Sequence, residues 1–229
     1  LSSIGYDKTA NITGGVAGYE DYWVVKLDNT GAIQWQNTIG GKSDDFLTCV
    51  EPTADGGYII GGYSNSTATG DKTETHFIGG TYQYDYWVLK LNAAGNIEWQ
   101  NTIGGTADDY LIDLAITPDG GYILGGYSFS NAAGDKAEPS KGGADFWIVK
   151  LGAIGNIEWQ KTYGGSYYEH VNTIQQTSDG GYILSGTSTS NDGDVSENHG
   201  NYDFWIVKLN ETGSIEWEKS LGGSESDIA

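Results

Sequence analysis

The sequence contains no arginine, and its 11 lysines face 31 acidic residues, which gives a formal net charge of −20. A chain with so few cations is poorly suited to neutralising a phosphate backbone, so the composition argues against nucleic acid as a partner. Such a charge keeps a protein soluble and favours cations or basic partners. An acidic surface without a specific ligand is the simpler interpretation, and charge alone identifies no partner.

Cysteine and proline are also scarce. Cys49 is the single cysteine, so no disulfide can form within the chain and no cysteine zinc cluster is available. Only three prolines are present, and the 36 glycines supply the turns instead. No apolar run approaches the roughly 20 residues that span a bilayer, so we expect no membrane-spanning segment. No signal peptide is visible at Leu1, and the chain looks like a mature or trimmed fragment.

A 21-residue pattern recurs four times along the chain. Its last copy reads DFWIVKLNETGSIEWEKSLGG, and the copies begin at Asp21, Asp85, Asp145 and Asp203. They are 64, 60 and 58 residues apart. The chain is therefore a tandem repeat, and this period sets the size of its structural unit.

Each repeat predicts four β-strands joined by glycine-containing turns. The first strand is rich in aromatic and β-branched residues and covers residues 22–27, 86–91, 146–151 and 204–209. The turn after it carries Gly31, Gly95, Gly155 or Gly213. A second strand then passes through the second tryptophan of the repeat. Another hairpin turns at an Asp-Gly-Gly sequence that begins at Asp55, Asp119 and Asp179.

Both faces of the first strand are apolar, which indicates a sheet with neighbours on both sides. Trp23, Val25 and Leu27 form one face, and Tyr22 and Val24 form most of the other. A β-sandwich would bury only one face, and a solenoid would repeat every 20 to 30 residues or so, whereas propeller blades take about 40 to 50 residues. We therefore predict an all-β fold, a β-propeller of four-stranded repeats of about 60 residues. The extra length falls in one long loop per repeat, whose place within or between blades stays open.

The alignment of the repeats predicts three complete repeats plus a split fourth. Leu1 aligns with Leu124 and Leu184, and Ala229 aligns with Leu111, so the two ends of the chain together make an incomplete repeat. We interpret residues 1–229 as a single β-propeller domain and expect it to be a fragment of a longer array. An overlap that closes a ring is the alternative.

The repeated motifs resemble the bacterial β-propeller repeat family often abbreviated SBBP. They are D-[YF]-W-[VI]-[VL]-K-L, G-x-I-[QE]-W-[QE], G-G-x-x-x-D and D-G-G-Y-I-[IL]-x-G, and they cover essentially the whole chain. The version abundant in secreted proteins of Bacteroidetes-type bacteria is the most similar. The resemblance implies an extracellular or cell-surface propeller, often part of a longer protein with a sorting domain for type IX secretion. No sorting domain is visible, and the family transfers no catalytic residues.

The eight tryptophans fall into two columns, which we expect in the core. Residues repeated at one strand position suit packing between blades better than ligand stacking. The first column comprises Trp23, Trp87, Trp147 and Trp205. The second comprises Trp35, Trp99, Trp159 and Trp217.

The long loops carry the candidate binding residues, because the strands repeat closely while residues 67–84, 131–144 and 191–202 diverge. The polar candidates are Asp71, His76, Asp135, Glu138, Asp192, Asp194 and His199. Asp192 and Asp194 come closest to a calcium-ligand run, although they lack the spacing of an EF-hand. Carboxylates that accept hydrogen bonds from turn N–H groups are the alternative. Calcium is the only cofactor for which we find a candidate site.

Signatures of catalysis are weak. His76, His170 and His199 occupy unrelated repeat positions, and no nucleophile elbow, zinc-protease motif or phosphate loop occurs. The pairs Asp44–Asp45 and Asp108–Asp109 could imitate a glycosidase pair, but adjacent residues of a strand point apart. We therefore predict a noncatalytic module that binds a protein or glycan at the cell surface. A structural subunit or spacer of a larger surface assembly and a glycan-processing enzyme are the alternatives.

Overall fold

The computed structural model describes residues 19–75 and 83–228, and these residues form β-strands, turns and loops without any helix. Consequently no helix in the described ranges could cross a membrane. The strands are β1 (Tyr22–Leu27), β2 (Ile33–Ile39), β3 (Asp45–Pro52), β4 (Tyr58–Ser64), β5 (Asp85–Leu91), β6 (Ile97–Ile103), β7 (Asp109–Ile116), β8 (Tyr122–Ser128), β9 (Asp145–Leu151), β10 (Ile157–Tyr163), β11 (Glu169–Gln176), β12 (Tyr182–Ser188), β13 (Asp203–Leu209) and β14 (Ile215–Leu221). The predicted all-β class is confirmed.

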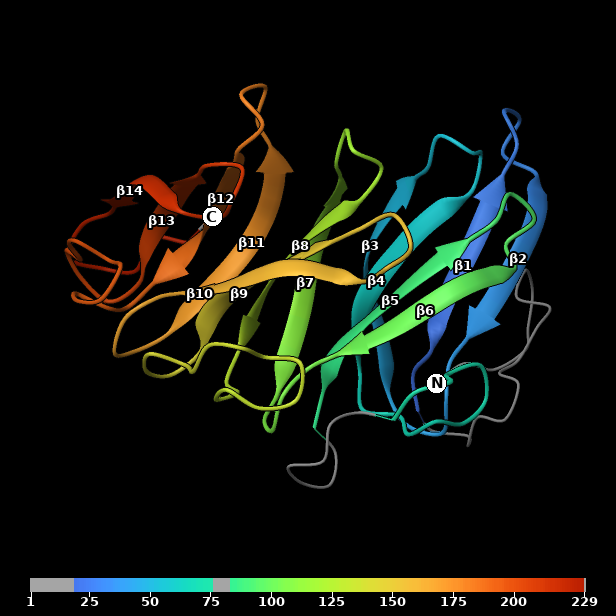
Figure 1. The fold of residues 1–229 in the computed structure, drawn as a ribbon, viewed down its shortest axis with the longest axis horizontal. Coiled ribbons are helices and arrows are strands. Elements are labelled where there is room, and N and C mark those ends of the chain that lie inside the picture. Colours follow the sequence, from blue (N-terminus) through green and yellow to red (C-terminus); the bar gives the residue numbers. More distant parts are fainter. Residues whose placement is uncertain (1–18, 76–82, 229) are drawn as a thin grey trace.

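Consecutive strands pair antiparallel into separate sheets (Figure 1). Three sheets have four strands, in the orders β3-β4-β5-β6, β7-β8-β9-β10 and β11-β12-β13-β14, and β1 and β2 form a two-stranded sheet. Each long loop joins the second strand of a sheet to the third, as between β4 and β5. Short connectors, such as residues 104–108, lead from one sheet to the next. The sequence left open whether the long loops lie within or between blades. Each of these loops connects two strands of the same sheet.

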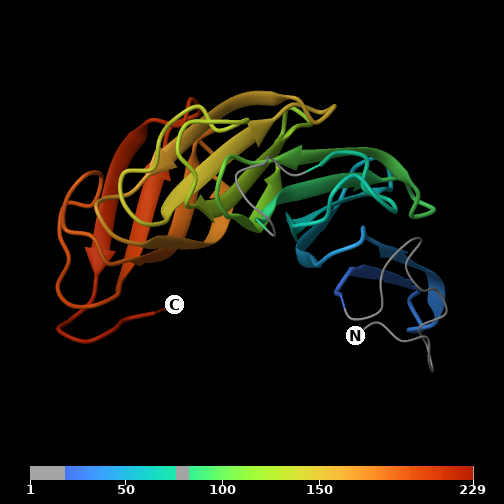
Figure 2. The same cartoon turned by 90° about the horizontal axis from the view of Figure 1, so that it is seen from below.

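The sheets stack face against face along an arc. Figure 2 shows the blue N-terminal sheet at one end of this arc and the red C-terminal sheet at the other. The first strand of each sheet makes the junction, because β7 packs against β3, β4 and β5, and β11 packs against β7, β8 and β9. Strands β5 and β9 are buried along their whole length. Their two apolar faces thus have neighbours on both sides, as predicted, and the arrangement is propeller-like.

The structural unit is out of phase with the sequence repeat. A four-stranded sheet runs from Asp45 to Ile103, whereas the repeated pattern begins at Asp21 and again at Asp85. The repeat that begins at Asp85 therefore draws two strands from one sheet and two from the next. Sequence similarity has no preferred starting point in a tandem array, so only the hydrogen-bonded pairing could fix this phase.

The first tryptophan column lies in the core, with one exception. Trp87, Trp147 and Trp205 are fully buried. Each contacts an aromatic ring of the sheet before its own, at the position directly before that sheet's tryptophan. The Tyr86 ring, for example, lies 4.9 Å from the Trp147 ring. Trp23 is 43% exposed, so its prediction as a core residue is wrong. Its sheet has two strands in the described part of the chain, and no preceding sheet covers the ring there.

Three tryptophans of the second column, Trp35, Trp99 and Trp159, lie half-buried between neighbouring sheets. The Trp159 ring lies 5.7 Å edge-on from Tyr182, and a Cβ atom on Gly213 would fall 2.9 Å from it. Glycine at this turn thus both adopts a φ of 79° and makes room for the ring. Trp217 is 49% exposed, which corrects its prediction as a core residue, because no further sheet in the described chain covers it.

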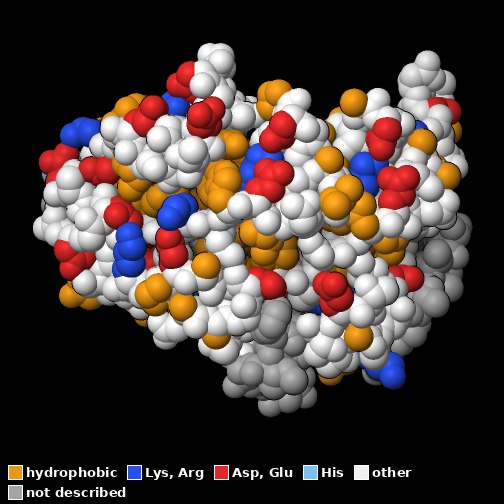
Figure 3. All heavy atoms as spheres, viewed as in Figure 1, with side chains coloured by type: hydrophobic (Ala, Val, Ile, Leu, Met, Phe, Trp, Pro, Cys, Tyr) orange, Lys and Arg blue, Asp and Glu red, His pale blue; other side chains and the backbone are white. Residues whose placement is uncertain are grey.

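A lysine residue is built into the end of each four-stranded sheet, opposite the long loops. The Lys150 side chain is almost fully buried, and its ammonium contacts Asp119 at 2.9 Å and Glu158 at 3.1 Å. Equivalent groups form around Lys90 and Lys208. Figure 3 shows lysine side chains standing between acidic ones on this face of the molecule. The repeated lysine of the W-[VI]-[VL]-K-L motif thus holds one turn of its sheet.

Substituting Gly125 with alanine should destabilise the protein by about 1–3 kcal/mol, the usual cost of overpacking. A Cβ atom on Gly125 would lie 2.9 Å from Ile174 of the next sheet. The third four-stranded sheet has Ser185 at this position, and in the described residues no further sheet faces it. The matched variant Ser185→Ala should change stability by less than about 0.5 kcal/mol. Urea unfolding measures both, and equal effects would contradict the close approach.

Candidate functional site

The long loops and the connectors lie at one end of the sheets, which we call the loop end. Strands β4, β8 and β12 finish at this end, and β5, β9 and β13 begin there. The long loops cover residues 65–84, 129–144 and 189–202, and the connectors cover residues 40–44, 104–108 and 164–168. The variable segments of the chain therefore share one face of the molecule, apart from residues 76–82, which lie outside the described ranges.

Three of the predicted binding residues tie a long loop to a connector. Asp135 accepts a hydrogen bond from the Gly104 N–H at 3.3 Å, and its own N–H donates to the Gly104 carbonyl at 2.9 Å. Asp71 makes the same pair of bonds with Gly40, and Asp194 makes it with Gly164. Each aspartate thus lies at a different junction between sheets, and the fold does not bring the three together.

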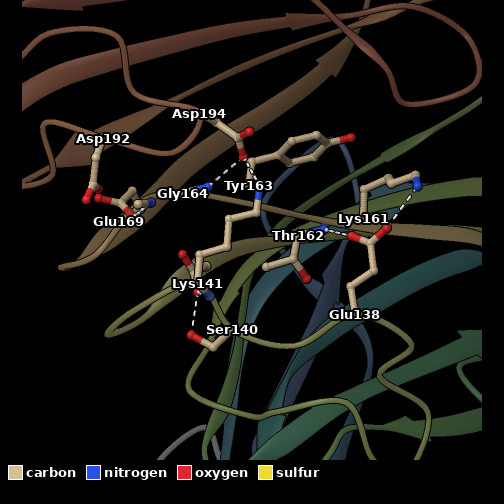
Figure 4. Close-up of polar contacts among 12 residues, drawn as sticks. Glu138, Ser140, Lys141, Lys161, Thr162, Tyr163, Gly164, Glu169, Asp192 and Asp194 are labelled. Carbon is tan, nitrogen blue, oxygen red and sulfur yellow. Dashed lines mark hydrogen bonds and ion pairs between the residues drawn. The ribbon is translucent and has the colours of Figure 1, made fainter.

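Glu138, Asp192 and His199 also have protein partners, and Figure 4 shows the first two residues. Glu138 accepts hydrogen bonds from the Lys161 ammonium and the Thr162 N–H, both at 2.9 Å. Asp192 accepts one from the Ser166 N–H at 2.7 Å. The His199 ring contacts Asp203 at 2.8 Å. His76 lies outside the described residues.

The candidate calcium residues Asp192 and Asp194 belong to no group of ligands of the kind that a metal ion needs, as far as the structure describes the chain. In the two described ranges no group of three or more His, Cys, Asp or Glu side chains could hold a metal ion. Asp194 pairs with Lys141 as well as with Gly164 (Figure 4), and the Ser166 hydroxyl also donates to Asp192. These contacts match the alternative role, in which the carboxylates accept hydrogen bonds from loop groups.

A buried carboxylate begins the first strand of each four-stranded sheet. In the second of these sheets Asp109 accepts hydrogen bonds from the Gly105 N–H at 2.7 Å and the Ser130 hydroxyl at 2.9 Å. Burial raises the pKa of Asp109 to about 6. Lys136 is buried nearby, and burial lowers its pKa to about 8 while Asp109 and Asp145 oppose this shift. This polar cluster anchors the connector and the long loop to the sheet.

The third four-stranded sheet builds the same cluster without a lysine. Glu169 replaces the aspartate and accepts hydrogen bonds from the Gly165 N–H at 2.8 Å and the Ser188 hydroxyl at 2.7 Å. Val195 replaces the lysine and is buried in the core. Burial raises the pKa of Glu169, and hydrogen bonds from Ser190, Gly165 and Ser188 oppose this shift. The cluster is thus structural, since its chemistry changes while its position is kept.

An aromatic row crosses the loop end, and the sequence reasoning missed it. The aromatic row comprises Phe46, Tyr63, Tyr84, Tyr110, Tyr127, Phe129, Tyr168 and His170. Its rings come from β3, β4, β7, β8 and β11 and from the segments beside them. The sequence does contain a signal for these positions, because an aromatic residue follows the acidic residue at the start of β3, β7 and β11. Only the structure shows that these positions meet those at the ends of β4 and β8.

Ring contacts run without a break through the aromatic row. Phe46 lies 5.1 Å from Tyr63, Tyr63 lies 4.9 Å from Tyr110, Tyr110 lies 5.0 Å from Tyr127, and Tyr127 lies 4.4 Å from His170. These distances are those of favourable aromatic pairs. The row therefore passes both junctions between the three four-stranded sheets.

The aromatic row is partly open to solvent and flanked by acid. Phe129 is 37% exposed and Tyr168 is 46% exposed, and the other rings are half-buried. Burial, with Asp44 contributing, raises the pKa of Tyr84 to about 12. Burial and Asp108 raise the pKa of Tyr110, and burial lowers that of His170. At neutral pH the row is therefore uncharged.

The adjacent aspartates at the starts of β3 and β7 lie in different surroundings. Asp109 is fully buried in its polar cluster, whereas Asp108 is half-buried and accepts a hydrogen bond from the Tyr84 N–H at 3.0 Å. Asp45 is likewise buried and accepts a hydrogen bond from the Gly41 N–H, whereas Asp44 is half-buried and accepts one from the Glu20 N–H. The two side chains of each pair thus lie in different environments, as predicted.

The single cysteine is held in its thiol form. Burial raises the pKa of the Cys49 thiol to about 12, which keeps it protonated at neutral pH.

A polar cavity of about 490 Å³ opens between the first two four-stranded sheets. Glu74, Asn101 and Asp135 contribute its polar lining. Glu74 accepts a hydrogen bond from the Thr102 N–H at 2.8 Å, and Asp135 is bonded to Gly104. The carboxylates at its edge are therefore held by the backbone, and the described residues of its lining include no further titratable group.

Comparisons with known proteins give similarities of fold only. No family model and no curated protein matches the chain. Among solved structures, a variant of the Synechocystis apocarotenoid oxygenase is 14% identical with a TM-score of 0.44, and the match covers 88% of this chain and 45% of the oxygenase. A protein of unknown function from Bacteroides caccae is 11% identical with a TM-score of 0.33, over 89% of this chain and 78% of that one. The chain spans less than half the length of the oxygenase.

Proposed function

We propose that this chain is a noncatalytic β-propeller module that binds a glycan or protein partner outside the cell or at the bacterial surface, and that the loop end is the contact face. One observation carries the proposal. All described parts of the variable loops, the connectors and the aromatic row lie at this one end. Repeated strands supply a rigid scaffold, and residues that differ between repeats gather where a partner can reach them.

The composition of the loop end also suits binding. Its loops are rich in Ser, Thr, Asn and Gly, and its aromatic row is rich in Tyr, which is the combination that binding surfaces of adaptable proteins use. Tyrosine supplies contact area at a low cost in side-chain entropy, and short polar residues supply hydrogen bonds. The sequence resemblance to secreted propellers supports the extracellular location.

Exchange of the exposed loop residues tests the proposed function. The structure refines the design, because Lys136 is buried and Ser140 bonds to Asp145. Both residues should be kept, while residues 131–133 and residues 137–139 are replaced with the corresponding residues of the 191–202 loop. Binding to a printed glycan array should change its profile after exchange, while the melting temperature stays within a few degrees of the parent value.

An unchanged glycan profile after exchange of every described loop would contradict the loop-end contact face. Release of shortened sugars from any bound glycan, lost on substitution of one carboxylate, would show instead that the protein is an enzyme. A control replaces Asn29 of the β1–β2 turn, at the opposite end of the sheets, with glutamate, the residue at the matching position 211, which should leave the profile unchanged.

A further inference from the structure

We infer that the aromatic row is the binding site for a chain of neutral sugars. The inference rests on the proposed function, since it assigns the ligand class and the contact residues of the loop end. Sugar rings present faces of polarised C–H groups, and the face of an aromatic ring carries the partial negative charge that attracts them. Contiguous, partly exposed rings on a protein surface are a mark of binding surfaces.

The length of the aromatic row calls for a ligand of several units. Rings in contact lead from Phe46 on the first four-stranded sheet to His170 on the third. The exposed rings of Phe129 and Tyr168 lie 6.4 Å apart beside the second junction. A single sugar would cover one part of such a surface, whereas an extended chain can contact rings from all three sheets.

Packing between sheets does not by itself explain the aromatic row. The buried tryptophan of the first column recurs in every four-stranded sheet. By contrast, Tyr63 and Tyr127 are matched by Thr187 in the third sheet. Tyr84 of the first sheet is matched by Ala144 in the second, whereas the third sheet has Tyr202 there. The fold therefore accepts a small residue at positions where another sheet places a half-buried ring.

The charges around the aromatic row select a neutral ligand that donates hydrogen bonds. Asp44 and Asp108 flank the rings. Burial is the main cause of the raised pKa of Tyr84, and both aspartates add to it, so their negative charge acts on the row. No arginine exists in the chain to pair with an anion. Sugar hydroxyls can donate to these carboxylates, whereas a polyanion is repelled. A proline-rich peptide also suits aromatic surfaces, but it offers mainly carbonyl acceptors.

Affinity electrophoresis tests this inference. The protein is run in native gels that contain xyloglucan, galactomannan or dextran, and in a gel that contains polygalacturonate as the anionic comparison. We expect retardation by at least one neutral polysaccharide and none by polygalacturonate. The double variant Phe129→Ala/Tyr168→Ala removes the most exposed rings of the row and should weaken binding by roughly tenfold, since two ring contacts are lost.

Two further variants separate stacking from stability. Tyr110→Phe keeps the ring and should bind within about threefold of the parent, because stacking survives the loss of the hydroxyl. Trp217→Ala removes an exposed ring outside the aromatic row and should bind as the parent does. No retardation by any neutral polysaccharide, or equal retardation of the parent and the double variant, would overturn the inference. If the inference failed in either way but loop exchange still altered the glycan-array profile, the proposed function would remain supported without the aromatic row as its site.

Discussion

Replacing Trp147 with alanine should lower the free energy of unfolding by about 3–5 kcal/mol, as removal of a large buried aromatic side chain does. The indole is fully buried between two sheets, and its N–H donates to Gln160 at 3.0 Å. The Lys136 ammonium lies 5.2 Å from the ring, and the Tyr86 hydroxyl donates to the Trp147 carbonyl at 3.0 Å. Substitution would leave a cavity where these groups meet. Urea denaturation measures the loss.

Trp23→Ala provides the matched control for Trp147→Ala. Both residues occupy the same position of the repeated pattern, but Trp23 is 43% exposed. Its replacement should cost less than about 1.5 kcal/mol, because much of its surface is already in water. Similar costs for the two variants would mean that repeat position, and not burial between sheets, sets the contribution of these tryptophans.

Replacing Lys136 with methionine should destabilise the protein at pH 7.5 by about 3–5 kcal/mol, the usual effect of removing one partner from a set of buried charges. Methionine keeps the apolar stem and loses the ammonium that donates to Thr162 at 2.6 Å and faces Asp109 and Asp145. These two buried carboxyls would then lack their cation. The control Lys161→Met removes a half-exposed ion pair with Glu138 and should cost less than about 1 kcal/mol.

The effect of Lys136→Met should shrink as the pH falls from 7.5 to 5. Burial raises the pKa of Asp109 from 3.8 to about 6. The stabilisation that comes from protonating this buried carboxyl is therefore fully present below pH 4 and is lost as the pH rises through 6. At pH 5 most of the Asp109 carboxyl is protonated and needs no cation. Urea midpoints at the two pH values give the comparison, and a loss that grew at pH 5 would contradict the role of Lys136 as the partner of a carboxylate.

Local patterns were sufficient to predict the strands and the turns. Apolar residues on both faces of β5 and β9 indicated a strand with two covered faces, and both strands are buried throughout. Glycine at Gly95 and Gly155 indicated turns, and both have positive φ. These features depend on a few neighbouring residues, and each recurs in several copies. The same patterns placed Trp23 and Trp217 in the core wrongly, because burial there depends on a neighbouring sheet.

The candidate site could be predicted only in part. The long loops were identified as the variable segments, but the aspartates singled out in them bond to connector glycines, as Asp135 does to Gly104. Sequence variation shows where residues differ and does not show which side chains are already occupied. The aromatic row was missed because Tyr63 and Tyr110 belong to different sheets and meet only across a junction.

The sequence by itself determined an all-β repeat chain, its four-strand unit, its turns and its acidic surface, because strand period, turn chemistry and charge are properties of short segments. The tertiary structure decided the phase of the sheets, the burial of each tryptophan and the course of the aromatic row. These depend on which strand edges pair and which faces come into contact. Such contacts join residues that are distant in the chain, and no local pattern encodes their distance or their exposure.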